Sequence, residues 1–585
     1  MPPGQFSGQG LESAARAWAT IRGRQAIRWR PMFEDLTYEE LRRRANAALP
    51  ERLVARLEAR GERRTVAAGD VMYRSDDRPY PFVYAVSASL RIRDPMGMVL
   101  GVMGPGQFTG DLSLLLSQTA FTDCVVVEPG EVVVLPAAQI VELVQVDPEI
   151  SDLLLEAFAA RRSMQIQRQQ GTLLLVGSLE APGLRRVLVY ADRNRIPYRW
   201  IDPSDPAQLA EVPAVAIGGE GVKVVVRGRH VLTDPTVADV ARALGLDLAV
   251  RDGQPADLII VGAGPAGLSA AVYGASEGLR TILLDDVAIG GQAASSSRIE
   301  NFLGFPTGIS GADLAFRAEL QAVKFGARVG TPRHARTLRA GGHGGFYEIA
   351  LDDGAVLRGR AVVIATGARY RKLGVAEEDR FQGLGLYYAA TELEARTCKD
   401  QEVVVVGGGN SAGQAAMFMA SRAACVRLVH RGRDLADSMS NYLVERLRHA
   451  KNVRIETGSQ IVQLKGDERL RQVAIRNGDG AVVERPAGGL FAMIGAAPCT
   501  TWLEGAVGLD DRGFVITGEA CGAAAPQPFN IFQTTQPGVF AVGDVRSGSV
   551  KRVASAVGEG SVVVQAIHTR LAALREAEGR QPVTQ

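Results

Sequence analysis

The sequence predicts a multidomain chain: a β-roll of the α+β type, then a small α/β unit, then two doubly wound α/β domains, one nested inside the other. Three observations predict this order. Glycine-rich turns at 262–267 and 407–412 each join a buried β-type run to an Ala-rich helical pattern, which is typical of parallel βαβ units. The second turn lies between two parts of the first domain. Between 63 and 134, short β-type runs alternate with turn signals, which favours a roll or barrel.

The bulk composition is that of a globular protein with several domains. At about 150 residues per domain, the 585 residues predict about four domains. The net charge of +2 gives no field that favours nucleic acid or an anionic membrane, and no apolar run reaches the ~20 residues of a bilayer crossing. The five cysteines form no CxxC, so neither a disulfide scaffold nor a metal site is expected. We expect a cytoplasmic protein without nucleic-acid or membrane partners.

Three segments precede the first glycine turn. Residues 1–60 carry Arg and Ala in helical patterns and are expected to form a helical extension. Residues 61–170 hold the β-roll and end in a long helix. Residues 171–250 alternate strand and helix patterns, from a strand at 172–176 to a helix at Val237–Leu244, and form the small α/β unit.

The β-roll carries a first resemblance. The stretch GDVMYRSDDRPYPFVYAVSASLRI, followed by GPGQFTGDLSLLLSQTAFT, resembles a cyclic-nucleotide-binding domain. In that family a Glu binds the ribose and an Arg pairs with the cyclic phosphate; these positions fall on Asp111 and Ala120. Because Ala120 removes the bidentate partner of the phosphate, the resemblance implies a docking or packing domain. A reductase regulated by a cyclic nucleotide is the alternative.

The small α/β unit resembles thioredoxin and glutaredoxin domains. The resemblance rests on RNRIPYRWIDP and on the step at Val212–Val215, in which Pro213 would be the cis-proline of that family. The CxxC of the family falls on Ala181–Leu184, which contains no cysteine. Without a thiolate there is no thiol–disulfide exchange, so we expect this unit to bind or brace.

The first glycine turn predicts a dinucleotide site. Gly262 makes the tight turn, Gly264 leaves room for a pyrophosphate to approach the backbone, and Gly267 lets helix and strand pack closely. The start of the helix offers free N–H groups and a positive dipole end to the phosphates. Asp285, roughly 20 residues further on at the end of the next strand, can accept hydrogen bonds from ribose hydroxyls.

Three more motifs follow in order: Gly290-Gly291-Gln292, Ala365-Thr366-Gly367 and Gly543-Asp544. With the first turn, they resemble the thioredoxin reductase family of FAD-dependent pyridine nucleotide oxidoreductases, from about residue 257 to the C-terminus. The resemblance implies a Rossmann-like FAD-binding domain over 255–373 and 490–585. The residues that it assigns to FAD are Gly262, Gly264, Pro265, Ala266, Gly267, Asp285, Gly291, Gln292, Asn301, Thr366, Gly367, Gly543, Asp544, Arg552, Val553 and Ala554.

The nested domain, over 374–489, is expected to bind NAD(P)H. Where an NAD site places an acid, this chain places Arg431 and Arg433, which suits a 2′-phosphate and favours NADPH over NADH. The family also implies two orientations of this domain about its double linker, and a homodimer formed through the FAD domains. The residues assigned to NAD(P)H are Gly407, Gly409, Asn410, Ser411, Ala412, His430, Arg431 and Arg433.

The redox cysteines of that family are missing. Thioredoxin reductases carry Cys-Ala-Thr-Cys before the second glycine turn, where this chain has Ala389 and Glu392 at the cysteine positions. Cys398 lies nearby, but one cysteine cannot cycle as an internal disulfide, so we expect it to be a half-buried apolar residue and assign no catalytic residue. We expect hydride to pass from NAD(P)H to FAD and on to an external acceptor, a small molecule or a redox protein. A regulatory or redox-sensing flavoprotein whose N-terminal domains dock a partner is the alternative.

Overall fold

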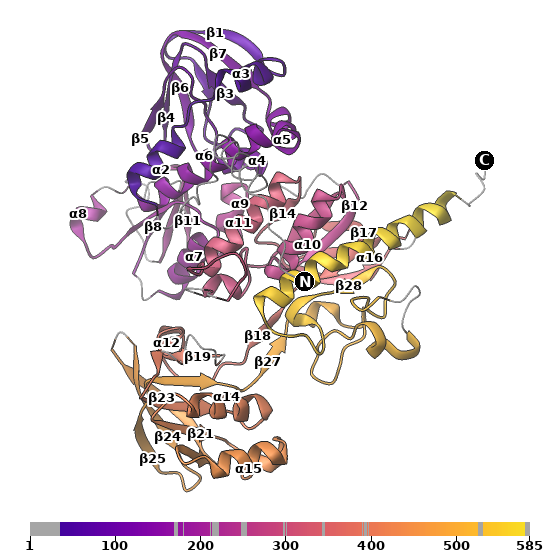
Figure 1. Cartoon of the computed structure of the whole chain (residues 1–585). Helices are drawn as coiled ribbons and strands as arrows, with labels where there is room; N and C mark the ends of the chain where they lie inside the picture. Colours follow the sequence, from indigo (N-terminus) through magenta and orange to yellow (C-terminus); the bar gives the residue numbers. More distant parts are fainter. Residues whose placement is uncertain are drawn as a thin grey trace, which may run out of the picture.

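The computed structural model shows four units (Figure 1). It describes residues 36–168, 173–178, 181–210, 212, 221–246, 254–296, 299, 301–341, 345–388, 390, 395, 397–467, 469–524 and 530–579. Pro213, Ala389 and Glu392, for which the sequence predicts special positions, lie outside these residues. Among the residues that are described, no helix combines the length and the apolar character that a bilayer crossing requires.

Two helices, α2 (Tyr38–Ala45) and α3 (Glu51–Glu58), precede the β-roll. The roll consists of two sheets, β1-β7-β3 and β2-β6-β4-β5, all antiparallel, as the alternating turn signals predict. The short α4 (Leu112–Leu115) lies between the strands, and α5 (Ala137–Val146) and α6 (Pro148–Gln167) follow them. The strands are β1 (Glu62–Val66), β2 (Val71–Tyr73), β3 (Phe82–Ala85), β4 (Ser89–Arg93), β5 (Val99–Met103), β6 (Asp123–Glu128) and β7 (Gly130–Leu135).

The central α/β unit has one sheet in the order β11-β10-β8-β9. β8 pairs in parallel with β9 and antiparallel with β10, so the sheet is mixed. The helix predicted at Val237–Leu244 is α9, with the same bounds and a Thr236–Asp239 capping box at its start. The remaining elements are β8 (Leu173–Val176), α7 (Pro182–Arg193), β9 (Tyr198–Ile201), α8 (Pro206–Leu209), β10 (Lys223–Val226) and β11 (His230–Thr233).

The third unit is built on a large sheet in the order β14-β13-β12-β17-β16-β15, with β28 paired to β17. The β12, β13, β14, β17 and β28 pairings are parallel, and the β15-β16-β17 part is antiparallel. Its elements are β12 (Ala256–Val261), α10 (Pro265–Ser276), β13 (Thr281–Leu284), η4 (Ala293–Ser295), α11 (Gly311–Lys324), β14 (Arg328–Gly330), β15 (Ala335–Ala340), β16 (Tyr347–Leu351), β17 (Val356–Ile364), η6 (Thr501–Leu503), η7 (Gly518–Ala524), β28 (Val539–Ala541), η8 (Gly543–Val545) and α16 (Val553–Gly579).

The fourth unit is inserted into the third. A parallel sheet, β19-β26-β20-β21-β22, is accompanied by an antiparallel sheet, β23-β24-β25. A two-stranded ribbon of β18 (Ala368–Tyr370) and β27 (Ala496–Pro498) joins the units (Figure 1). The elements are α12 (Glu378–Phe381), β19 (Leu386–Tyr387), β20 (Glu402–Val406), α14 (Asn410–Ala420), β21 (Cys425–Val429), η5 (Leu435–Asp437), α15 (Asn441–His449), β22 (Val453–Glu456), β23 (Gln460–Gly466), β24 (Leu470–Arg476), β25 (Val482–Pro486) and β26 (Gly489–Ala492).

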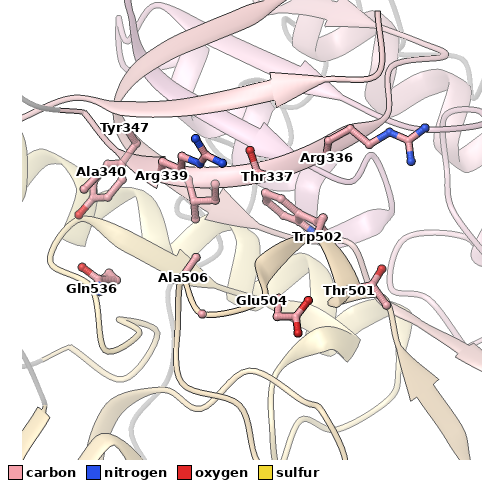
Figure 2. Close-up of a pocket in the computed structure, with 12 residues that line it drawn as sticks. Arg336, Thr337, Arg339, Ala340, Tyr347, Thr501, Trp502, Glu504, Ala506 and Gln536 are labelled. Carbon is pink, nitrogen blue, oxygen red and sulfur yellow. The ribbon is translucent and has the colours of Figure 1, made fainter. Parts of the chain in front are cut away.

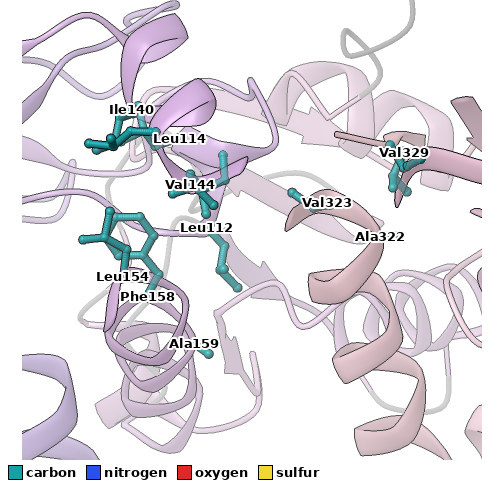
Figure 3. Packing of buried hydrophobic residues seen from close by; sticks show 14 of the residues in the cluster. Leu112, Leu114, Ile140, Val144, Leu154, Phe158, Ala159, Ala322, Val323 and Val329 are labelled. Carbon is teal, nitrogen blue, oxygen red and sulfur yellow. The ribbon is translucent and has the colours of Figure 1, made fainter. Parts of the chain in front are cut away.

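The β-roll packs directly on the third unit. One buried apolar cluster includes Leu154 and Phe158 of α6 together with Ala322 and Val323 of α11 (Figure 3). At its edge the Lys324 ammonium lies 3.0 Å from an Asp152 carboxylate oxygen. Since burying apolar surface is the main favourable term in packing, the roll and the third unit form one continuous core.

Candidate active site

The first glycine turn is open at one position only. A Cβ on Gly262 would lie 2.3 Å from the Ala365 carbonyl oxygen, and one on Gly267 would lie 1.8 Å from that of Gly262. At Gly264, by contrast, no atom lies within 4 Å of the position of a Cβ. Gly262 also has φ +105°, which favours glycine. The turn therefore has the free space that a pyrophosphate needs, and it is at Gly264, as the sequence predicts.

The helix that follows presents its N-terminus to this space. α10 has Gly264 as its N-cap, without a side-chain hydrogen bond, and Pro265 at its first position. Its first N–H groups are thus available to an anion. Gly291 covers the turn, because a Cβ there would lie 3.0 Å from the Gly264 Cα. The Gly290 N–H donates to the Ala263 carbonyl oxygen at 2.7 Å.

Asp285 holds the backbone of both loops. Its carboxylate accepts hydrogen bonds from the N–H groups of Ala263 at 2.8 Å and of Val287 and Ala288 at 3.0 Å. Burial raises the pKa of Asp285, and the backbone hydrogen bonds oppose the rise. The carboxylate thus fixes the glycine turn; its contact with ribose hydroxyls stays a prediction.

The Gly543-Asp544 motif is held by a residue that the sequence pattern did not indicate. Glu559 of α16 accepts a hydrogen bond from the Gly543 N–H at 2.6 Å, and it lies 2.6 Å from the Arg546 guanidinium. Burial raises the pKa of the Asp544 carboxyl, and Lys551 opposes the rise. The signal that could have pointed to Glu559 was a carboxylate among the small and apolar residues of the first half of α16.

The other residues predicted for FAD lie on loops and on the first turns of α10 and α16. The Thr366 hydroxyl donates to the Cys499 carbonyl oxygen at 2.8 Å, and Gly367 accepts from the Cys499 N–H at 3.1 Å. The Gln292 amide donates to the Ala368 carbonyl. Exposed positions are held by Asn301, Arg552 and Ala554, whereas Ala266 is buried and Val553 half-buried. The contact of Asn301 with the flavin stays a prediction.

The second glycine turn repeats the arrangement. Gly407 has φ +148°, and a Cβ there would lie 2.4 Å from the Met493 carbonyl oxygen. α14 begins at Asn410 with Gly409 as its uncapped N-cap, and Ala412 is fully buried behind them. The Asn410 side chain accepts from the Ser440 N–H at 2.8 Å. This end of α14 is suited to a second pyrophosphate.

His430 lies beneath two glycines of this site. A Cβ on Gly408 would lie 2.2 Å from the His430 ring, and one on Gly432 would lie 2.4 Å from it. Arg431 and Arg433 are exposed beside it, where a 2′-phosphate could be reached. Ser411 is exposed on the first turn of α14. The binding of NAD(P)H by these residues stays a prediction.

None of the five cysteines forms a disulfide. Cys398 is fully buried, so the expectation of a half-buried residue is wrong; its sulfur lies 3.7 Å from the Gly488 carbonyl oxygen. Burial raises the pKa of Cys124 to about 12 and also raises the pKa of Cys499 and Cys521. Because the thiolate is the nucleophile, these thiols are poorly suited to redox exchange.

The phosphate cassette of the β-roll, the segment 111–120 where the family resemblance places the cyclic phosphate, contacts the central unit. Asp111 caps α4 by accepting from the Ser113 N–H at 2.7 Å, and Ala120 is buried. The Thr119 hydroxyl donates to the Leu244 carbonyl oxygen at 2.8 Å, and the Arg227 guanidinium donates to Thr119. These contacts agree with a docking role for the cassette.

The central unit also donates hydrogen bonds to the loop 285–292 of the FAD domain, called the FAD loop below. The Arg193 guanidinium donates to the Gly291 carbonyl oxygen at 2.7 Å, and the Asn194 amide donates to that of Val287 at 3.2 Å. Arg195 lies 3.4 Å from the buried carboxylate of Asp313 in α11. Side chains of the central unit thus hold this loop of the FAD domain in place.

A separate cavity of about 600 Å³ lies over β15 and η6 (Figure 2). Arg336, Arg339, Trp502 and Glu504 are among the residues that line it. None of the residues predicted to bind FAD or NAD(P)H lines this cavity, so we do not assign it to the redox site.

Two nested dinucleotide folds, each with an open N-terminal helix end, define an FAD-dependent pyridine nucleotide oxidoreductase. Residues 256–560, more than half of the chain, match the pyridine nucleotide-disulphide oxidoreductase family, and the chain belongs to that family. Residues 63–147 match the cyclic nucleotide-binding domain family. These matches confirm the prediction of two Rossmann-like domains, of a cyclic-nucleotide-binding-like β-roll, and of FAD and NADPH as the cofactors of the family, whereas the thioredoxin-like character of the central unit stays a prediction.

Known relatives and a solved structure are also similar to this chain over its reductase part. The chain is 32% identical over 369 residues to an alkyl hydroperoxide reductase protein of Xanthomonas campestris pv. phaseoli, over 62% of this chain and 65% of that protein. It is 32% identical over 324 residues to thioredoxin reductase of Streptomyces clavuligerus, over 55% of this chain and 96% of that protein. The structure of thioredoxin reductase from Streptococcus pyogenes MGAS5005 matches with a TM-score of 0.50 and 30% identity, over 55% of this chain and 100% of that one.

Proposed function

We propose that this protein oxidises NADPH through FAD and passes the electrons to an external acceptor without an internal dithiol. The observation that carries the proposal is the contrast between the open turn at Gly264 and the five cysteines, none of which forms a disulfide. Ala389 and Glu392 stand at the positions of the family's redox cysteines. A single thiol cannot cycle as an internal disulfide.

The chain's own residues bind and orient the cofactors. When bound, FAD supplies the centre that takes a hydride from NADPH and gives electrons to the acceptor. Gly264 and the start of α10 bind the pyrophosphate, and Asp544 accepts hydroxyl hydrogen bonds. With FAD bound, the positive dipole end at the N-terminus of α16 would stabilise the negative charge that the ring gains on reduction. Arg431 and Arg433 select NADPH over NADH by binding its 2′-phosphate.

The proposal leaves the identity of the electron acceptor to experiment. Two relatives are named as a thioredoxin reductase and an alkyl hydroperoxide reductase, so a redox protein or its disulfide is the class we test first. A quinone and dioxygen are the small-molecule acceptors to compare. We also propose a homodimer, as the family resemblance implies.

The primary test is a visible spectrum of the purified protein before and after NADPH is added without oxygen. We expect flavin bands that bleach on mixing. A flavin that stays oxidised for minutes, or a colourless preparation that takes up no added FAD, would contradict the proposal. The double variant Ala389→Cys/Glu392→Cys restores the family's cysteine pair and is expected to gain NADPH-dependent disulfide reduction. Each single variant is the matched control, because one thiol cannot form the pair.

A regulatory flavoprotein is a second candidate, favoured by one observation. The Arg193–Gly291 hydrogen bond couples the central unit to the FAD loop, so the redox state of the flavin could change how that unit docks. Limited proteolysis near residues 251–255 tests it in the oxidised and reduced protein. Identical cleavage rates in the two states would count against regulation.

A further inference from the structure

A groove, called the β15 groove below, runs along one edge of the large sheet of the third unit. β15 is the last strand in the order β14-β13-β12-β17-β16-β15, and in the described part of the chain it pairs only with β16. All residues from 336 to 340 line the cavity of about 600 Å³ (Figure 2). Because successive side chains of a strand point to opposite faces, a cavity lined by every one of them lies along the edge of the strand.

The opposite wall of the β15 groove comes from a distant part of the chain. Side chains of 501–506, which include η6, and of Gln536 line it. The Trp502 ring is half-buried, because it packs against the apolar cluster that contains Leu338 and also lines the groove. The β15 groove thus lies between the edge of a strand and an indole ring.

A bulge changes the direction of the side chains at the start of β15. The register with β16 shifts between Ala335 and Thr337, so Arg336 is an extra residue in this strand. Ala335 and Leu338 are three positions apart, yet both are buried in one apolar cluster. Strict alternation would place them on opposite faces, so the bulge lets the strand keep both in the core. Arg336 and Arg339, also three positions apart, are both exposed.

The β15 groove has an excess of positive charge. Neither Arg336 nor Arg339 makes a side-chain hydrogen bond or an ion pair with any residue that the structure describes. Glu348 lies opposite Arg339 on β16, but its carboxylate is held by the Arg358 guanidinium at 2.9 Å. Among the described residues that line the groove, Glu504 is the one carboxylate. Two guanidiniums against one carboxylate leave one positive charge in excess.

We propose that the β15 groove binds an extended acidic segment of a partner protein, which adds a strand to this edge of the sheet. Main-chain groups at a sheet edge pair with any extended chain, so side chains select the partner. Acidic side chains pair with Arg336 and Arg339, and an apolar side chain packs on Trp502. Glu504 lies on the other side of Trp502 from Arg336 (Figure 2). Since β15 has 6 residues, a segment of about six residues, or about 20 Å, fills the edge.

The test is fluorescence anisotropy of a rhodamine-labelled hexapeptide of alternating glutamate and valine, mixed with the oxidised, FAD-loaded protein. None of the residues predicted to bind FAD or NAD(P)H lines the groove, so the result does not depend on the proposed function. We expect saturable binding that weakens as the salt concentration rises. A protein that fails to bind this peptide at millimolar concentration would show that the arginines and the bulge only protect the edge from aggregation, and the proposal would fail.

Two control peptides separate charge from strand addition. A hexapeptide of alternating lysine and valine has the wrong charge for the two arginines. The acidic hexapeptide with proline in place of valine keeps its charge, but each proline lacks the N–H group that a strand must donate. We expect neither control to bind. Binding of the proline peptide as tight as that of the valine peptide would mean simple charge attraction, and equal binding of the lysine peptide would contradict the acidic partner.

Arginine variants test the charge contacts. Arg336→Ala/Arg339→Ala should weaken binding of the acidic peptide by at least about fivefold, because two exposed ion pairs are lost. Arg512→Ala removes an exposed arginine of the same unit that does not line the groove, and it should bind as the wild type does. Unchanged affinity in the double variant, or an equal loss in Arg512→Ala, would refute the proposed site.

Trp502 reports where the peptide binds, since it lines the groove and is one of 4 tryptophans in the chain. The unlabelled acidic peptide should change the tryptophan emission of the wild type but not that of Trp502→Phe, which keeps an aromatic ring and should still bind. An emission change that persists in Trp502→Phe would place the peptide elsewhere. Sedimentation tests the other occupant: a dimer that Arg336→Ala/Arg339→Ala converts to a monomer would put a second copy of this chain in the groove and overturn the proposal.

Discussion

The Arg193 guanidinium lies 2.7 Å from the carbonyl oxygen of Gly291, a residue 98 positions further along the chain. Gly291 in turn packs on Gly264, where the pyrophosphate of FAD is expected. A side chain of the central unit therefore holds one wall of a site in another domain. We therefore predict that the central unit, which has no CxxC, supports FAD binding through this contact.

Replacing Arg193 by Ala should weaken FAD binding while the fold is kept. A hydrogen bond from a charged donor contributes about 1.5–3 kcal/mol, so we expect FAD affinity to fall by at least about tenfold. Equilibrium titration of the apoprotein with FAD measures it. Arg186→Ala, an exposed position on the same helix, is the control. Equal affinity in the two variants would show that the contact is incidental.

Two glycines of one turn should respond differently to a side chain. Gly264→Val places atoms in open space and should leave the melting temperature unchanged, while FAD affinity falls by about 100-fold, equivalent to about 2.7 kcal/mol. Gly267→Ala meets the Gly262 carbonyl and should lower stability by about 1–3 kcal/mol. Thermal melts with FAD titrations separate the two effects. A Gly264→Val protein that binds FAD normally would place the pyrophosphate elsewhere.

Cyclic AMP and cyclic GMP should not bind. Asp111 already caps α4 and Ala120 offers no guanidinium, while Phe121 is buried in the core of the central unit. The ribose and phosphate partners are thus missing or occupied. Calorimetry at millimolar ligand is expected to show no heat beyond dilution. Saturable heat with either nucleotide would support the regulated-reductase alternative.

Stability should fall as pH rises from about 4.5 to about 7 because of Glu319. Burial raises the pKa of this carboxyl to about 7, and Arg162 and Arg195 oppose the rise. The folded protein therefore binds the proton more tightly than the unfolded chain, whose pKa is near 4.5. The stabilisation is full below about pH 4.5 and is lost as pH rises through about 7. Thermal melts between pH 5 and 8 should show a slope that Glu319→Gln removes; a parallel slope in the variant would contradict this.

Arg431 and Arg433 should determine the choice of nicotinamide coenzyme. The double variant Arg431→Ala/Arg433→Ala is expected to raise KM for NADPH by at least about tenfold, since a charge-assisted contact to phosphate is lost, while KM for NADH stays the same. Steady-state reduction of an artificial acceptor with each coenzyme measures it. Arg446→Ala, an exposed arginine on α15, is the control. Equal losses for both coenzymes would place the 2′-phosphate elsewhere.

The parts of the site that follow from local patterns were predictable. Gly262, Gly264 and Gly267 belong to one strand–turn–helix segment, so their spacing alone indicates which glycine is open. Contacts between segments that are distant in the sequence could not be predicted in this way. Arg227 pairs with Asp76, 151 residues away, and that contact depends on how two domains dock. Glu559 was missed because a helical carboxylate usually faces solvent. Ala389 and Glu392 lie outside the described residues, so their place beside the flavin stays a prediction.

The shared apolar core of the β-roll and the FAD domain sets a limit on dissecting this chain. Ala322 and Val323 of α11 are buried in the same cluster as Leu154 and Phe158 of α6. A reductase half expressed from residue 255 onward would expose that face of α11 to water, and such patches promote aggregation. The N-terminal modules are therefore an integral cover of the flavoenzyme rather than a detachable sensor, and truncations should be designed to keep them.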